Sequence, residues 1–81
     1  MQPEEVKRLL SSRLEGCSVE VSGDGRHFDL VVVGEIFQGL SPVRKQQLVY
    51  AALRDEIASG AIHAVNMRTL TPDEWSASPP A

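Results

Sequence analysis

The sequence contains one cysteine, Cys17, among its 81 residues. A single thiol cannot close an internal disulfide, so the chain is not one of the small secreted domains that disulfides hold together. It also lacks any run of the roughly 20 apolar residues that a membrane helix requires, and its first ten residues contain no continuous hydrophobic signal core. We therefore expect a cytoplasmic protein that does not insert into membranes and depends on packing for its stability.

Basic side chains are few, with eight Lys and Arg against 11 Asp and Glu, and the formal net charge is −3. Proteins that bind nucleic acid chiefly through its phosphates carry a clear surplus of Lys and Arg, so this balance argues against such binding as the main function. Arg44 and Lys45 stand near the start of a predicted helix. They form either an ordinary solvated surface or a local contact for nucleic acid or an acidic partner.

The groupings that catalysis needs are also missing. No serine or cysteine occurs in a nucleophile-elbow sequence, and no nucleophile, base and orienting acid can be assembled. The glycine segments 23–25 and 34–39 have neither the spacing nor the Lys-Ser/Thr pair of a phosphate-binding loop. We expect a protein that is not an enzyme.

The hydrophobic pattern predicts six elements in the order helix, strand, strand, helix, strand, short helix. Between the first two strands, Gly23, Asp24 and Gly25 tolerate positive φ and predict a tight turn. The predicted ranges are a helix over 3–14, strands over 18–22 and 27–37, a helix of about four turns from 42 that ends at Gly60, a strand over 62–70 and a helical turn over 71–75.

The long second helix has a clear start, with Ser41 as N-cap and Pro42 at the first helical position. At the last helical turn, Thr71 and Glu74 have the spacing of a capping box. The second-helix residues expected to face the core are Val43, Val49, Tyr50, Leu53 and Ile57, with Lys45 outside that stripe.

These elements predict an α+β fold, with both long helices packed on one face of a three-stranded sheet. The long connection from the second strand to the third allows a parallel pairing, which would make the sheet mixed. The length of 81 residues suits a single core, so we expect one domain over 1–75 and a flexible tail over 76–81.

The two histidines are the main candidates for a binding site. A closed zinc site needs four nitrogen or sulfur ligands, whereas this chain offers His27, His63 and Cys17, none of them at the short spacing of a zinc finger. The chain could instead supply half of a site, since two histidines can hold one iron of a 2Fe-2S cluster when cysteines hold the other.

Ordinary structural roles compete with this hypothesis. His27 would directly follow an exposed turn, where a histidine often has no binding role. His63 shares strand parity with Val65 and Met67, which also suits a hydrogen-bonded core residue. Cys17 between Gly16 and Ser18 suits a small, partly buried filler.

Several motifs together resemble the BolA family, in its histidine-type bacterial branch. They are F-x-G-x-S at Phe37–Ser41, QQ-x-VY at Gln46–Tyr50, IHA at Ile62–Ala64 and TP-x-EW at Thr71–Trp75, and the resemblance extends from the first helix to Trp75. It implies a fold similar to class II KH domains, in agreement with the predicted element order.

The resemblance also implies a function. It implies a heterodimer with a monothiol glutaredoxin, in which the two proteins and glutathione share a 2Fe-2S cluster, for iron-sulfur cluster trafficking or for iron or stress regulation. The metal ligands implied are His63 and, from the loop between the first two strands, His27; Cys17 does not match the family's loop cysteine. We expect the isolated chain to bind no cluster and to be a monomer or weak dimer.

The alternative function is that of a transcriptional regulator that binds DNA through its KH-like fold. However, the sequence has no G-x-x-G loop flanked by basic residues, which KH domains use to clamp a nucleic-acid backbone. A pure interaction adaptor without metal is a third possibility.

Overall fold

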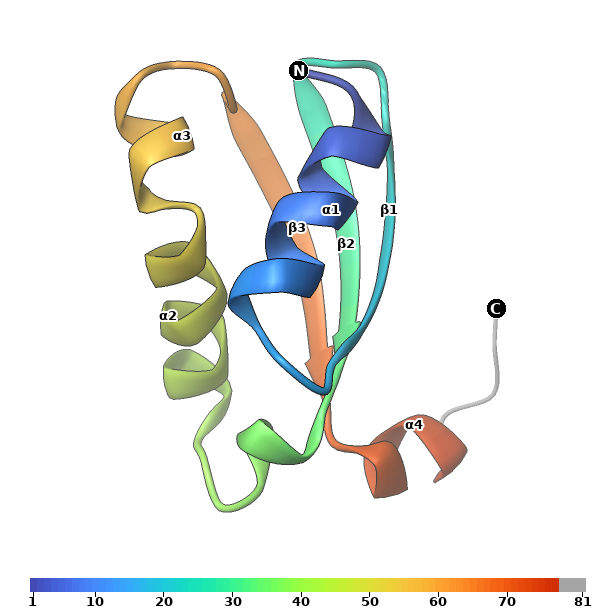
Figure 1. Cartoon of the computed structure of the whole chain (residues 1–81). Helices are drawn as coiled ribbons and strands as arrows, with labels where there is room; N and C mark the ends of the chain where they lie inside the picture. The colour runs from blue at the N-terminus through green and yellow to red at the C-terminus, as the bar shows by residue number, and fades with distance from the viewer. Residues whose placement is uncertain (78–81) are drawn as a thin grey trace.

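The computed structural model describes residues 1–77 as a three-stranded sheet with helices packed against it (Figure 1). The strands lie in the order β1-β2-β3, with β1 antiparallel to β2 and β2 parallel to β3, so the predicted mixed α+β sheet is confirmed. The elements are α1 (Pro3–Arg13), β1 (Ser18–Gly23), β2 (His27–Val33), the 3-10 helix η1 (Glu35–Phe37), α2 (Pro42–Ala52), α3 (Arg54–Ala58), β3 (Ala64–Leu70) and α4 (Pro72–Ala77).

The core lies between the sheet and the two longest helices, α1 and α2, which cover the same face of the sheet (Figure 1). Alternation along β2 turns Phe28, Leu30 and Val32 toward this core, as the sequence pattern predicts. The buried hydrophobic residues are Val6, Leu10, Leu14, Val19, Phe28, Leu30, Val32, Phe37, Val49, Leu53 and Ile62.

The predicted long second helix is interrupted at Leu53, whose φ of −109° and ψ of 13° separate α2 from α3. Val49 and Leu53 are buried as predicted, but the core positions assigned to Val43, Tyr50 and Ile57 are wrong, because all three are exposed. The break removes Ile57 from a regular i, i+4 stripe, whereas Val43 and Tyr50 project to other sides of α2 than Val49 does.

The prediction that Lys45 lies outside the buried stripe is wrong, because Lys45 is only 7% exposed. It occupies the helical position one turn before Val49, on the inner side of α2. Its Nζ donates a hydrogen bond to Glu74 Oε1 at 2.7 Å, and this ion pair compensates the buried charge. The start of α2 is thereby joined to α4.

Two strand boundaries are shorter than predicted. β2 ends at Val33 rather than at residue 37, because residues 35–37 form the 3-10 helix η1. β3 begins at Ala64, so Ile62 and His63 precede the strand instead of opening it. Ile62 is nevertheless buried in the core.

The predicted capping box at the last helix is confirmed. Thr71 Oγ1 accepts a hydrogen bond from Glu74 N at 3.1 Å, and Glu74 Oε1 accepts one from Thr71 N at 2.8 Å. The helix extends to Ala77, two residues past the predicted boundary, and the rest of the predicted tail, 78–81, lies outside the described residues. Within residues 1–77, no helix is both long and apolar enough to cross a membrane.

Candidate functional site

The parallel pairing of β2 with β3 brings the two histidines to the same end of the sheet. His27 opens β2 opposite Ala64, the first residue of β3, and Ala64 N donates a hydrogen bond to Arg26 O at 3.2 Å. His63 directly precedes Ala64. Two residues 36 positions apart in the sequence are therefore neighbours along the strand ends.

The turn that carries His27 is built around the Asp24 carboxylate. Asp24 Oδ1 accepts hydrogen bonds from the backbone N–H groups of Arg26 and His27, both at 2.9 Å. These bonds, the one from His27 first, lower the pKa of Asp24 to about 2. The carboxylate therefore stays ionised and holds the backbone that presents His27.

Asp24 also lies beside the His27 ring, with His27 Nδ1 3.7 Å from Asp24 Oδ2. This contact is on the Nδ1 side, so Nε2 is the nitrogen directed away from the carboxylate. Carboxylates in this relation to a histidine orient its ring and fix its tautomer in metal sites. The sequence pattern identifies Asp24 only as a turn residue, and it misses this positioning contact.

The predicted tight turn is present, and its positive φ angles lie at the two glycines and not at Asp24. Within residues 1–77, positive φ occurs only at glycines, including Gly23 at 149° and Gly25 at 94°. Asp24 contributes its side-chain acceptor instead, while the two glycines reverse the chain. At Gly23 a Cβ would collide with the His27 carbonyl, so this turn also needs glycine for space.

Both imidazoles are accessible from solvent. Because Phe28 and Leu30 face the core, His27 lies on the opposite face of β2, which α1 and α2 leave uncovered. His63 is exposed and its side chain makes no hydrogen bond or ion pair to the residues described here. The alternative of a hydrogen-bonded core histidine is therefore wrong for His63.

Cys17 is far from this end of the sheet. It precedes Ser18, which pairs with Val33 at the other end of β2, roughly 20 Å of strand away from His27. The thiol is half-buried, and desolvation raises the pKa of Cys17, which disfavours the metal-binding thiolate. The expected filler role of Cys17 agrees with this position.

As metal ligands, the two histidines would make an incomplete set. Among residues 1–77, no group of three or more His, Cys, Asp or Glu side chains could hold a metal ion. An iron of a 2Fe-2S cluster that already has two sulfide ligands needs two protein ligands, so a pair of imidazoles matches one half of a shared cluster. The assignment of His27 and His63 as ligands stays a prediction.

The family model described as BolA-like protein matches residues 4–74 of the chain. The chain belongs to the BolA family. It is 46% identical over 76 residues to the acid stress protein IbaG of Escherichia coli K12, which covers 94% of this chain and 90% of that protein. The resemblance seen in the sequence motifs is thereby confirmed.

Solved structures of BolA proteins confirm the fold. A bolA protein homologue from Coxiella burnetii superposes with a TM-score of 0.86 at 34% identity, covering 94% of this chain and 97% of that one. The BolA domain of SufE1 from Arabidopsis thaliana gives 0.78 at 31% identity, covering 89% and 93%. The predicted BolA-like α-β-β-α-β-α order is therefore correct.

Proposed function

We propose that this BolA protein is a non-enzymatic partner of a monothiol glutaredoxin, with which it shares a glutathione-ligated 2Fe-2S cluster. The role proposed for this complex is iron-sulfur cluster trafficking or iron or stress regulation. The observation that carries the proposal is the pair of exposed imidazoles, His27 and His63, at adjoining strand ends. Among residues 1–77 they belong to no group of three or more possible metal ligands. A second protein must complete such a site.

The proposed roles divide between the chain's own residues. His27, held by the Asp24 turn, and His63, at the start of β3, would bind one iron through their imidazole nitrogens. The cluster when bound supplies an iron-sulfur centre whose potential is raised by histidine ligation. Thiolates from glutaredoxin and glutathione would hold the other iron.

Histidine ligation makes the proposed complex sensitive to acid. An imidazole must be deprotonated to bind a metal, so ligation weakens as the pH falls. The E. coli relative is named an acid stress protein. A cluster whose ligands are lost on acidification would connect that name with the site proposed here.

The test is a titration of this chain into cluster-loaded monothiol glutaredoxin with glutathione, followed by visible absorption and circular dichroism. The wild-type chain should change the cluster spectrum and saturate at one chain per glutaredoxin. His27→Ala and His63→Ala should each reduce or abolish the change. Cys17→Ser is the matched control, because it alters a potential ligand at the other end of the sheet and should leave the spectrum as in wild type.

The regulator alternative predicts a different result. A DNA-binding protein should bind a duplex in the absence of glutaredoxin, with affinity that falls steeply with salt. An unchanged cluster spectrum together with such salt-dependent DNA binding would replace the cluster proposal by the regulator. An unchanged spectrum without DNA binding would favour the metal-free adaptor.

A further inference from the structure

The outer side of α2 carries an apolar groove that the cluster proposal does not use. Its volume is about 480 Å³. The residues from α2 recur at helical spacing, so they form one continuous face of the helix. The groove is lined by Leu40, Arg44, Gln47, Leu48 and Ala51, which we call the α2 groove.

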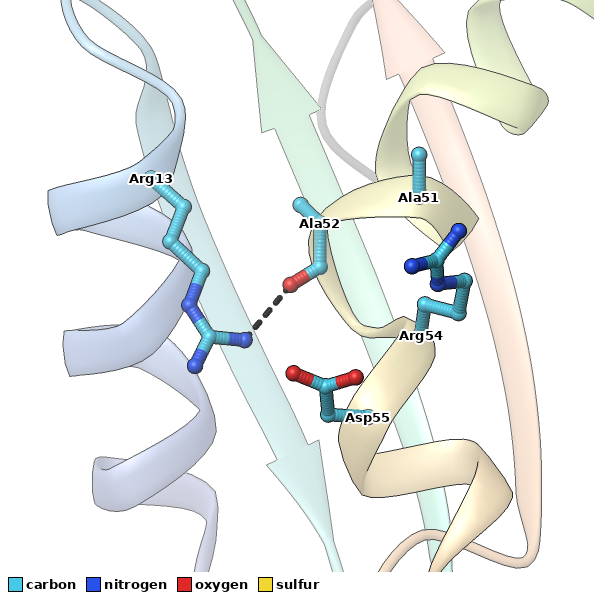
Figure 2. A pocket seen from close by; sticks show the side chains of 5 residues that line it. All are labelled: Arg13, Ala51, Ala52, Arg54 and Asp55. Atoms are coloured by element: carbon cyan, nitrogen blue, oxygen red, sulfur yellow. Dashed lines mark hydrogen bonds between the residues drawn. The ribbon is translucent and has the colours of Figure 1, made fainter.

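The α2 groove continues past Ala51 into a second hollow of about 270 Å³ between α1 and the junction of α2 with α3. Figure 2 shows Arg54 beside Ala51, and Asp55 directed toward Arg13 of α1. Ala51 lines both hollows, so the two adjoin along the helix, and we call them together the channel. From Arg44 to Asp55 this channel extends for roughly 16 Å, or about three helical turns.

The centre of the channel suits contact with an apolar helix. Leu48 is 37% exposed and provides a large apolar side chain, while Ala51 one turn later has only a methyl group. A large residue followed by a small one lets a second helix approach closely and insert a side chain between them. Exposed leucine flanked by small and polar residues is typical of helix-in-groove recognition.

Each end of the channel carries an arginine, Arg44 at one end and Arg54, beside Asp55, at the other. The Arg44 and Arg54 side chains form no hydrogen bond or ion pair among residues 1–77. Arg13, by contrast, is neutralised, since it donates to Glu56 at 2.6 and 3.2 Å and to Ala52 O at 2.7 Å. Arg44 lies in the first turn of α2, where the helix dipole adds to its positive potential.

We propose that this channel binds an amphipathic helix of a second partner protein, with apolar side chains at its centre and Asp or Glu at both ends. Carboxylates would pair with Arg44 and Arg54, for which bidentate carboxylate recognition is well suited. The apolar floor disfavours a nucleic-acid backbone as the occupant.

The binding would leave the histidine end open. α2 starts near the end of the sheet at which β2 and β3 finish, whereas His27 and His63 lie where these strands begin (Figure 1). Neither histidine lines the channel, so the proposed helix site and the proposed cluster site consist of different residues. The proposal goes beyond the cluster partnership and does not depend on it.

The experiment is selection from a displayed library of 16-residue peptides on the full-length chain. Enriched peptides should share two apolar residues three or four positions apart, with an acidic residue about one turn beyond each. Amide NMR shifts caused by the synthesised peptide should map to α2 and its junction with α3. Arg44→Glu and Leu48→Glu should each raise the dissociation constant of the peptide at least tenfold. Both side chains are exposed, so both variants should keep the far-UV circular dichroism of the folded chain.

Arg26→Glu is the matched control, because it makes the same charge change at an exposed arginine outside the channel and should leave affinity unchanged. Three outcomes would overturn the proposal. These are no enrichment of helical acidic peptides, NMR shifts that map to another face, or a DNA duplex that causes the α2 shifts when no peptide does. Concentration-dependent shifts of the chain alone at these residues would instead assign the channel to a second copy.

Discussion

At the scale of the residue, Asp24 supports the turn that carries the proposed ligand His27. Its carboxylate accepts two backbone hydrogen bonds, which hold the start of the strand, and its second oxygen lies 3.7 Å from Nδ1 of His27. We expect Asp24→Ala to weaken the spectral response to cluster-loaded glutaredoxin, because His27 loses its support.

Asp24→Asn separates the two contributions of this side chain. The amide oxygen can still accept the backbone bonds, so the turn should persist, while the charge beside the ring is lost. Its affinity for the cluster-loaded partner should therefore lie between wild type and Asp24→Ala. Equal, wild-type titrations for both variants would show that Asp24 does not position His27.

Asp24 also predicts a pH effect on the isolated chain. The native pKa of about 2 is below the ordinary value of 3.8, so the hydrogen bonds contribute fully above that value and are lost as the pH falls through about 2. Urea unfolding measured from pH 5 to pH 2 should show that the free energy of unfolding falls less in Asp24→Asn than in wild type. An identical pH profile would contradict this assignment.

Gly34 and Cys17 are in close steric contact. A Cβ at Gly34 would overlap Cys17 Sγ, although the Gly34 backbone itself needs no positive φ. Gly34→Ala should lower the free energy of unfolding by about 1–3 kcal/mol, the usual cost of overpacking. Cys17→Ala removes the sulfur, so the double variant should regain part of that loss.

Denaturant unfolding of both single variants and the double variant measures this coupling. Additive effects would mean that the clash is relieved elsewhere. Because the Cys17 prediction concerns packing alone, the same variants should leave the cluster titration unchanged.

At the scale of the element, the link between α2 and α4 is an ion pair at a helix cap. The Glu74 carboxylate accepts from Lys45 Nζ and from Thr71 N, and these contacts, Lys45 first, place the pKa of Glu74 below its ordinary value of 4.5. Because the folded-state pKa is lowered, the stabilisation is complete above that value and is lost as the pH falls through the lowered one.

Glu74→Gln tests this link. At neutral pH it should destabilise the protein, because Lys45 is left buried without a counter-charge. The difference in unfolding free energy between wild type and variant should shrink toward acid pH, where the wild-type carboxylate is also neutral. A difference that is constant from pH 7 to pH 2.5 would contradict a role for the Glu74 charge.

The elements also show what hydrophobic periodicity can and cannot predict. The alternating apolar residues of β2 predict its buried face because strand geometry leaves only two directions for a side chain. The same reasoning misplaces Ile57 and Lys45. The break at Leu53 and the charge pair across to Glu74 both depend on contacts between distant segments, which local spacing does not contain.

At the scale of the whole molecule, the pairing of the histidines is a property of topology. Chemistry alone suggests a partial metal site, but only the parallel register of β2 and β3 places His27 and His63 at one end of the sheet. The crossover through α2 and α3 makes that parallel register possible. The positioning role of Asp24 and the exposure of His63 also emerge only in the folded chain.

The arrangement separates two surfaces on a chain of 81 residues. The histidines occupy the end where β2 and β3 begin, and α2, which lines the channel, starts near the other end of the sheet (Figure 1). Under the two proposals, the chain would contact a cluster partner and a second protein through different residues.

The most direct measurement is the visible circular dichroism of cluster-loaded monothiol glutaredoxin and glutathione as this chain is added. The cluster proposal predicts a new spectrum that saturates at one chain per glutaredoxin, is lost in His27→Ala and His63→Ala, and is retained in Cys17→Ser. A spectrum that does not change when the wild-type chain is added would contradict the proposal. So would a change with both histidine variants that is as large as the change with wild type.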